Sequence, residues 1–336
     1  MTNRNREDNC MDTSMSEKKE LTLELIRDRI IAPIFRRCCP KLWMKISQQR
    51  RHHYCNEYIV EEEVHTVISN MINSEKPVML GRLGNTERHI IAEYLMKKNG
   101  VLKRYSPKWK NWLLSTSGFF VLDNEEDEID ELAELILSSM SECDLEGIWD
   151  FEFERFLITR YAKNAKITHV NNTLIYTNTM QSWGMSLKGK RVLVISPFEE
   201  TIRIQYDRRE MIWSGKKILP DFTLMTLKAP YTAGGNIPQN KYWMNIYEDL
   251  CRRIDKIDFD VAIIGCGVYG YPLSAYIKQS GRKALEMCGE TQIIFGIIGK
   301  RWEDGGYVDK YKNEYWIHPI DDKPINYQSI EGGCYW

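Results

Sequence analysis

Phe259-Asp-Val-Ala-Ile-Ile-Gly265-Cys-Gly-Val-Tyr-Gly270 is the stretch of sequence that decides the fold. A short apolar run ends in a glycine-rich turn, and apolar residues at helical spacing follow over residues 271–279. A buried strand that runs through such a turn into a helix begins a βαβ unit, which joins parallel strands. The stretch therefore predicts an α/β fold with a parallel sheet.

The same alternation of strand and helix extends to both sides of this stretch. Further buried strands are expected at 190–196, 222–227 and 283–287, and helices at 199–213, 242–257 and 291–298. Such alternation favours a parallel sheet with right-handed crossovers. Residues 186–302 are therefore expected to form a Rossmann-like nucleotide-binding domain, with ligands bound beyond the carboxyl ends of the strands.

The first half of the chain has a different pattern. Helices are expected at 61–73, 90–96, 125–140 and 152–161, with one short buried strand at 77–83. Residues 57–185 are thus expected to be mainly helical, residues 1–20 to form a disordered polar tail, and residues 303–336 to form a C-terminal extension. The predicted fold class is α/β: a Rossmann-like parallel sheet with flanking helices, preceded by a mainly helical N-terminal part.

Residues 21–56 form a basic amphipathic segment. From residue 29 to residue 56 the segment has no acidic side chain, while its basic residues are Arg29, Arg36, Arg37, Lys41, Lys45, Arg50 and Arg51. A segment of this kind can lie on an anionic membrane surface. The alternative is a helix docked on the body of the protein with a solvated basic face.

The composition excludes several classes of protein. The net charge of −1 gives no overall field that would attract nucleic acid, and 43% hydrophobic residues are enough for a packed core. None of the nine cysteines stands in a Cys-x-x-Cys pair, which indicates reduced thiols. Neither a signal peptide nor an apolar run of membrane-spanning length is visible. We therefore expect a cytoplasmic protein, in peripheral contact with the inner face of the membrane if the basic segment binds there.

The glycine-rich turn has three interpretations. Gly265, Gly267 and Gly270 match G-x-G-x-x-G, and Glu286 ends the next strand about 20 residues later, as a ribose-binding acid does in NAD sites. Against NAD, the turn is the third of its domain, and only about fifty residues remain after Glu286, too few for a second mononucleotide half. A nucleoside diphosphate fits the turn equally well, because glycines let backbone N–H groups approach a phosphate. A tight turn that packs helix on strand is the structural alternative.

Arg82-Leu-Gly-Asn-Thr-Glu87 is a second motif, and its charged side chains are suited to binding or catalysis. The predicted strand ends in a cation, a glycine turn follows, and a carboxylate stands in the first turn of the next helix. Such a carboxylate can hold a metal ion or bind sugar hydroxyls, although a glutamate near a helix N-terminus is also ordinary capping.

Four segments of the chain carry a resemblance to a known family. They are Leu80-Gly-Arg-Leu-Gly-Asn-Thr-Glu87, Leu187-Lys-Gly-Lys-Arg-Val-Leu-Val-Ile-Ser-Pro-Phe198, Asp260-Val-Ala-Ile-Ile-Gly-Cys-Gly-Val-Tyr-Gly-Tyr-Pro-Leu273, and Gly289-Glu-Thr-Gln292 through Lys300-Arg-Trp302. Together they resemble the bacterial GT-D-fold glycosyltransferases, most closely uncharacterised relatives found in surface-polysaccharide gene clusters. The terminal Glu331-Gly-Gly-Cys-Tyr-Trp336 is also similar to these relatives.

The resemblance implies transfer of a hexose from a nucleotide-sugar donor, most readily a UDP-sugar, to a glycan or lipid-linked acceptor. It also implies Mn²⁺ or Mg²⁺ held partly by an Asp-x-Glu pair, here Asn85 and Glu87. Asn85 stands where the family has Asp, and Thr86 replaces a glycine. A site with one charge fewer binds a divalent cation more weakly.

The candidate site residues follow from these motifs and from the resemblance. Arg82, Lys300 or Arg301 would neutralise charge that develops on the leaving diphosphate. Glu286 or Glu290 would act as general base, and Glu87 would hold the metal or the donor. The donor-binding residues are expected to be Ser196, Pro197, Phe198, Gly265, Gly267, Gly270, Thr291, Lys300 and Arg301. Two other functions stay open: an NAD(P)-linked oxidoreductase, and a non-catalytic nucleotide-binding partner in a polysaccharide assembly complex.

Overall fold

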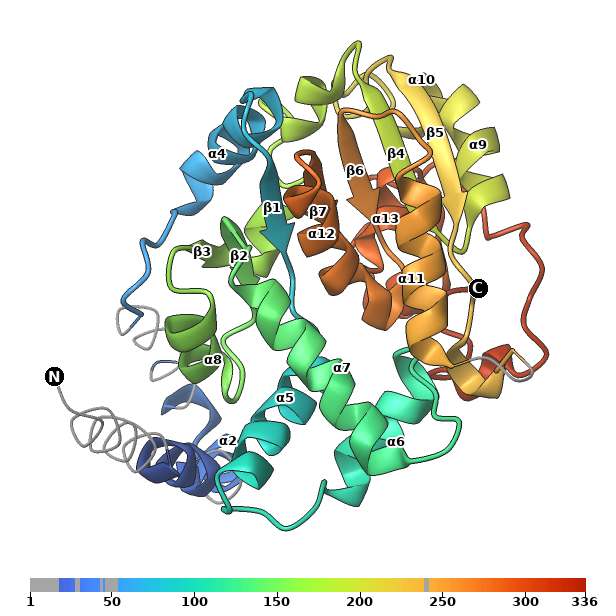
Figure 1. The fold of residues 1–336 in the computed structure, drawn as a ribbon. Coiled ribbons are helices and arrows are strands. Elements are labelled where there is room, and N and C mark those ends of the chain that lie inside the picture. The colour runs from blue at the N-terminus through green and yellow to red at the C-terminus, as the bar shows by residue number, and fades with distance from the viewer. Residues whose placement is uncertain (1–17, 28–30, 43–44, 46–53, 239–241) are drawn as a thin grey trace, which may run out of the picture.

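The computed structural model describes residues 18–27, 31–42, 45, 54–238 and 242–336 (Figure 1). Its seven strands are β1 (Val78–Gly81), β2 (Leu145–Ile148), β3 (Lys166–His169), β4 (Arg191–Ser196), β5 (Thr223–Lys228), β6 (Val261–Ile264) and β7 (Lys283–Glu286). They form one sheet in the order β3-β2-β1-β7-β6-β4-β5, and every pair of neighbours is parallel. The predicted α/β fold with a parallel sheet and flanking helices is confirmed.

Helices connect the strands and cover the sheet. They are α2 (Ala32–Cys38), α4 (Glu61–Asn73), α5 (Asn85–Lys98), α6 (Pro107–Thr116), α7 (Glu125–Met140), α8 (Glu154–Tyr161), α9 (Glu199–Asp207), α10 (Arg209–Ile212), α11 (Trp243–Ile254), α12 (Gly270–Gln279), α13 (Glu290–Ile294) and α14 (Lys300–Gly305). Short 3₁₀ turns occur at Val170–Thr173, Trp183–Leu187, Ala233–Gly235, Gly267–Tyr269 and Tyr327–Ser329.

The inner strands of the sheet are buried on both faces, as the continuous apolar runs of β4 and β6 predict. Side chains alternate along β4: Leu193 and Ile195 join a core with α5, α7, α8, α11 and α12, while Val192 and Val194 join a second core with α4, α9, α10 and α13. The two sets of helices lie on opposite sides of the sheet (Figure 1). The strand ends, rather than the faces, are therefore the places where a ligand can reach the sheet.

One sheet unites the two halves of the chain. β1, from the half expected to be mainly helical, pairs with β7 in the register Val78↔Lys283 and Leu80↔Leu285. The Arg82 motif after β1 and the segment after β7 are consequently neighbours in space. The predicted domain boundary near residue 186 stays a prediction, but the sheet crosses it.

Most elements lie where the sequence places them. The helices over 61–73 and 125–140 have the predicted bounds, and the predicted helix at 199–213 is divided into α9 and α10. The sequence pattern does not predict β2, β3, α6 or α14. The first half thus contributes three strands where one was expected.

The N-terminal region departs from the expected tail. Residues 18–20 are helical rather than disordered, because this helix docks on the body of the protein. Leu21 is fully buried, and Glu20 accepts a hydrogen bond from Arg160 at 2.6 Å. Residues 1–17 and much of the basic segment (28–30, 43–44 and 46–53) lie outside the described residues, so its contact with a membrane stays a prediction. Across the described ranges, no helix has both the length and the apolar character needed to cross a membrane.

Candidate functional site

A cavity of about 340 Å³ opens at the carboxyl end of the sheet. Its walls come from the segments that follow β1, β2, β4, β5, β6 and β7, together with α6 and the C-terminal residues. The chain leaves β4 toward β5 and leaves the adjacent β6 in the opposite direction, toward β7. Ligands of open parallel sheets bind at such a switch point in strand order.

The cavity gathers most of the residues that the sequence singled out. Those that line it are Arg82, Asn85, Glu87, Ser196, Pro197, Phe198, Gly265, Gly267, Glu286, Thr291 and Arg301. Three others do not line it: Gly270, Glu290 and Lys300. The Glu290 carboxylate instead accepts hydrogen bonds from the hydroxyl of Tyr176 at 3.1 Å and the indole of Trp302 at 3.5 Å.

Arg82 places a buried guanidinium beside the cavity. The residue follows β1 and is only 2% exposed. Its Nη1 donates to the carbonyl oxygen of Met287 at 2.7 Å, and its backbone N–H donates to Glu286 at 3.3 Å. Its Nε is buried and has no hydrogen-bond partner within the described part of the chain. A buried N–H group without a hydrogen-bond acceptor destabilises the fold unless a ligand accepts its hydrogen bond.

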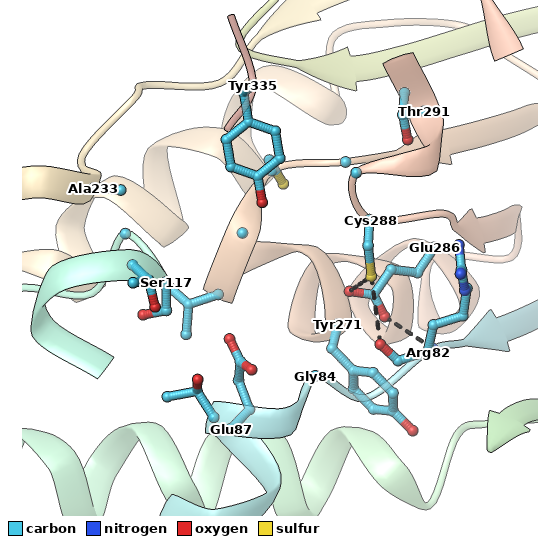
Figure 2. Close-up of a pocket in the computed structure, with 18 of the residues that line it drawn as sticks. Arg82, Gly84, Glu87, Ser117, Ala233, Tyr271, Glu286, Cys288, Thr291 and Tyr335 are labelled. Atoms are coloured by element: carbon cyan, nitrogen blue, oxygen red, sulfur yellow. Dashed lines mark hydrogen bonds between the residues drawn. The ribbon is translucent and has the colours of Figure 1, made fainter. Parts of the chain in front are cut away.

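Glu87 extends its carboxylate into the cavity from the first turn of α5 (Figure 2). Desolvation raises the pKa of this carboxyl above its ordinary value, against the opposing effects of its own backbone N–H and of Arg88. The carboxylate lies against Gly84, where an added Cβ would come within 2.2 Å of Glu87 Oε2. Gly84 is therefore needed for space rather than for an unusual backbone angle.

This contact leads to a prediction for Gly84→Ala. The backbone of Gly84 is extended, with φ of −65°, so alanine fits it and stability should stay the same or rise by about 0.4–1 kcal/mol. The added methyl group displaces the Glu87 carboxylate, and if this carboxylate holds the sugar-nucleotide donor that the sequence resemblance implies, hydrolysis of that donor should fall at least tenfold. Thermal unfolding and a donor-hydrolysis assay on the same preparation check both parts. Full activity in Gly84→Ala would contradict a role for the observed carboxylate position.

Two buried glutamates lie behind the Arg82 motif. Glu286 ends β7, and desolvation raises the pKa of its carboxyl well above the ordinary range, while Glu146 and Glu87 raise it further. Glu146, on β2, accepts hydrogen bonds from the backbone N–H of Leu83 at 2.9 Å and the hydroxyl of Tyr271 at 2.8 Å. Carboxyls with raised pKa values in a cavity are suited to proton transfer near neutral pH. Glu146 is not among the site residues predicted from the sequence, because the strand that carries it was not predicted.

Glu146 should make stability depend on pH. Burial raises its pKa from 4.5 to about 7. The stabilisation from its protonated form is therefore present below about pH 4.5 and is lost as the pH rises through about 7. Ionisation of Glu146 should lower the free energy of unfolding of the wild-type protein by on the order of 3 kcal/mol between pH 4.5 and pH 8. Glu146→Gln stays neutral and should not show this decrease. Urea unfolding at both pH values measures this, and identical pH dependence in the two proteins would contradict it.

The glycine-rich turn is covered by another part of the chain. Gly267 has a positive φ of 62°, and an added Cβ would lie 2.3 Å from the carbonyl oxygen of Ser117. The same carbonyl accepts the backbone N–H of Val268 at 2.9 Å. Gly270 makes room for Glu286, whose Oε1 would lie 2.8 Å from an added Cβ. These contacts alone account for both glycines, so phosphate binding at Gly267 and Gly270 stays a prediction.

The C-terminal residues Glu331 and Tyr335 form one wall of the cavity, and this position was not predicted from the sequence. The backbone N–H of Arg301 donates to the carbonyl of Cys334 at 3.0 Å, and its guanidinium pairs with Glu331 and the hydroxyl of Tyr335. Tyr335 points its hydroxyl toward the cavity (Figure 2). The buried hydroxyls of Tyr231 and Thr291 also line the cavity and have no partner among the described residues. This wall offers a cation and several hydroxyl donors to an anionic ligand. Lys300, by contrast, is exposed and does not line the cavity, and its backbone N–H donates to the carbonyl of Trp336 at 3.2 Å.

The residues at the expected metal site do not fit a divalent cation. The side-chain oxygen of Asn85 accepts a hydrogen bond from the Arg88 guanidinium at 2.6 Å, which places a positive charge where a cation would bind. In the described ranges no group of three or more His, Cys, Asp or Glu side chains could hold a metal ion. Arg88 is completely buried, so it cannot move aside easily.

Asn85→Asp tests this arrangement. An aspartate at residue 85 would pair with Arg88, because the guanidinium already lies at hydrogen-bond distance. We therefore expect the affinity for Mn²⁺, measured by calorimetry, to change less than threefold. Binding of Mn²⁺ tightened more than tenfold would show that Asn85 is a weakened metal ligand.

Comparisons with known proteins add little to this picture. No protein-family model matches the chain, and no curated protein matches it. One similar solved structure is a selenomethionine-substituted domain of unknown function 1792, with 12% sequence identity, a TM-score of 0.33, and coverage of 80% of this chain and 97% of that chain. Another, of the same domain and described as having a distinct glycosyltransferase fold, has 12% identity, a TM-score of 0.34, and coverage of 82% and 94%.

Proposed function

We propose that the chain is a glycosyltransferase that uses a nucleotide-sugar donor, with UDP-sugars the first to test. The observation that carries the proposal is the grouping, at the edge of one cavity, of the buried Arg82 guanidinium with the carboxyls of Glu87 and Glu286. A transferase of this kind needs a cation for the leaving diphosphate and carboxyls for sugar hydroxyls and proton transfer. The sequence resemblance supports a role in surface-polysaccharide or glycoconjugate biosynthesis.

In this proposal the donor lies along the carboxyl edge of the sheet. We place the nucleoside diphosphate near the ends of β4 and β6, where Arg301, Thr291 and Tyr231 offer donors. The sugar then points toward the end of β1, where Arg82 and Glu87 lie. The bond from the anomeric carbon to the diphosphate oxygen breaks, the diphosphate keeps the electron pair, and the acceptor oxygen forms the new bond.

Glu286 is the candidate base for the acceptor proton. Burial and neighbouring carboxylates raise its pKa, so its ionised form, which the backbone N–H of Arg82 stabilises, is a stronger base than an exposed glutamate. Glu290, the other candidate from the sequence, lies outside the cavity lining. In this proposal the proton of the acceptor hydroxyl passes to Glu286 and Arg82 stabilises the departing diphosphate, so no step requires a metal.

An NAD(P)-linked oxidoreductase is the second candidate, and one observation favours it. β6, α12 and β7 form a parallel βαβ unit with Glu286 at the end of its second strand, as in dinucleotide sites. The close contact of Ser117 with Gly267 disfavours it, because that glycine is where a pyrophosphate approaches in such sites.

Calorimetry with UDP, GDP, CMP and NAD(H), each with and without Mn²⁺, separates the candidates. We expect a nucleoside diphosphate to bind at micromolar level without Mn²⁺. Binding of NAD(H) alone would favour the oxidoreductase. Binding of a nucleoside diphosphate without any turnover of its sugar ester would favour the non-catalytic partner.

A further inference from the structure

The loop after β2 carries two aromatic rings at the mouth of the cavity. The rings of Trp149 and Phe151 are nearly parallel, at an interplanar angle of 3° and a centroid separation of 6.1 Å. Both line the cavity, and Phe151 is 43% exposed. Trp112, in the middle of α6, also lines the cavity and is 43% exposed. Large aromatic side chains left this open to solvent at the rim of a cavity are typical of a binding surface.

A buried network holds this loop in a fixed shape. The Glu154 carboxylate accepts the backbone N–H of Trp149 at 2.9 Å and that of Phe151 at 3.3 Å. The loop also contains two non-glycine residues with positive φ, Asp150 at 58° and Phe153 at 61°. Residues in this region of backbone space persist only where the surroundings impose it, and they concentrate at functional sites.

The network also connects the rings to the Arg82–Glu87 motif. Arg88 pairs with Glu154 at 3.5 Å, bonds Asn85 at 2.6 Å, and lies 5.2 Å from the ring centroid of Phe151. Arg82 lies 5.8 Å from the ring centroid of Trp149. The aromatic rings are thus positioned against the residues that would meet the transferred sugar.

The place of the rings on the sheet indicates what they bind. β2 is three strands from β6 in the sheet order, about 14–15 Å at the usual strand spacing. A donor whose nucleoside lies near β4 and β6 reaches the β1–β2 side with its sugar end. A saccharide presents apolar C–H faces to aromatic rings and hydroxyls to carboxylates and amides. Both kinds of partner are present here, since Glu87 and the exposed Asn85 line the same mouth.

We propose that Trp149, Phe151 and Trp112 form a subsite for a saccharide ring of the acceptor, which we call the aromatic subsite. The inference deepens the proposed glycosyltransferase function and rests on it for the identity of the acceptor. It assigns Glu154 and Arg88 as positioning residues that hold the rings. It also gives Asn85 a role in that network in place of metal binding.

The test measures two affinities in the full chain and its variants. Saturation-transfer NMR with a panel of neutral tetrasaccharides, including cellotetraose and maltotetraose, reports on the aromatic subsite, and calorimetry reports on UDP. We expect Phe151→Ala to weaken saccharide binding at least ten times more than it weakens UDP binding. Phe151→Tyr keeps the ring and should retain saccharide binding. Tyr307→Ala is the matched control, since Tyr307 is 70% exposed and lies outside the cavity lining.

Three results would overturn the proposal. The first is wild-type saccharide affinity in Phe151→Ala, and the second is failure of every tetrasaccharide to bind the wild-type protein. The third is equal loss of UDP and saccharide binding in Phe151→Ala, which would assign the rings to the nucleobase. A different result would separate the two proposals. If saccharide binding depends on Phe151 but the protein binds no nucleotide, the nucleotide-sugar donor is contradicted and the aromatic subsite is supported.

Discussion

Glu87→Gln is expected to lower turnover of the nucleotide-sugar donor at least a hundredfold while leaving the fold intact. The carboxylate projects into the cavity and is placed there by the contact with Gly84. If it holds the donor sugar or stabilises charge at the reacting centre, an amide of the same shape cannot replace its negative charge. Glutamate in the first turn of a helix contributes only about 0.3–1 kcal/mol to stability, so the melting temperature should stay near that of the wild-type protein.

Glu125→Gln is the matched control for this substitution. Glu125 also occupies the first turn of a helix, α7, but it lies outside the cavity lining. Both variants should keep a melting temperature near that of the wild-type protein, and only Glu87→Gln should lose turnover. Equal turnover in the two variants would show that Glu87 only caps the helix and does not act on the donor.

Arg82→Lys is expected to lower donor turnover by a similar factor, a hundredfold or more. Lysine keeps the positive charge, but it cannot both donate to the carbonyl of Met287 and present a second N–H in the fixed geometry of a guanidinium. The buried Nε of Arg82 has no partner among the described residues, so the loss should appear most clearly in the affinity for UDP. A stability loss of about 1–3 kcal/mol is also expected if the ammonium leaves the Met287 carbonyl unpaired.

Arg191→Lys is the control for the loss of a guanidinium. Arg191 begins β4 at the opposite end of the sheet, where it pairs with Asp258 and Asp260. The Arg191→Lys variant should keep the UDP affinity and the donor turnover of the wild-type protein. If Arg82→Lys also keeps them, the cation that receives the diphosphate is elsewhere, and Arg301 on the opposite wall is the next to replace.

The parts of the fold that the sequence predicts are those with strong periodicity. β4 and β6 are continuous apolar runs, and α4 and α7 have clear helical spacing, so their positions could be predicted closely. β2 and β3 are short, and Leu145-Glu-Gly-Ile148 carries a charge and a glycine that argue against a strand. The fold accepts them because hydrogen bonds from Leu83 and Tyr271 satisfy the buried Glu146.

The residues of the candidate site likewise fall into those that could be predicted from the sequence and those that could not. Arg82, Glu87 and Glu286 could be predicted, because each stands at the end of a recognisable strand or the start of a helix. The C-terminal wall and the aromatic subsite could not, since they depend on which distant loops meet at the sheet edge. The covering of Gly267 by Ser117 is likewise a tertiary contact with no local signal.

The release of UDP from a UDP-hexose by the purified full chain, without acceptor or added metal, tests the glycosyltransferase function most directly. We expect UDP and free hexose in equal amounts, as water replaces the acceptor, with release accelerated by a saccharide that binds the aromatic subsite and lost in Glu87→Gln. A protein that binds a sugar nucleotide but releases no nucleoside diphosphate under any of these conditions, or one that instead oxidises or reduces a nicotinamide cofactor, would contradict a transferase.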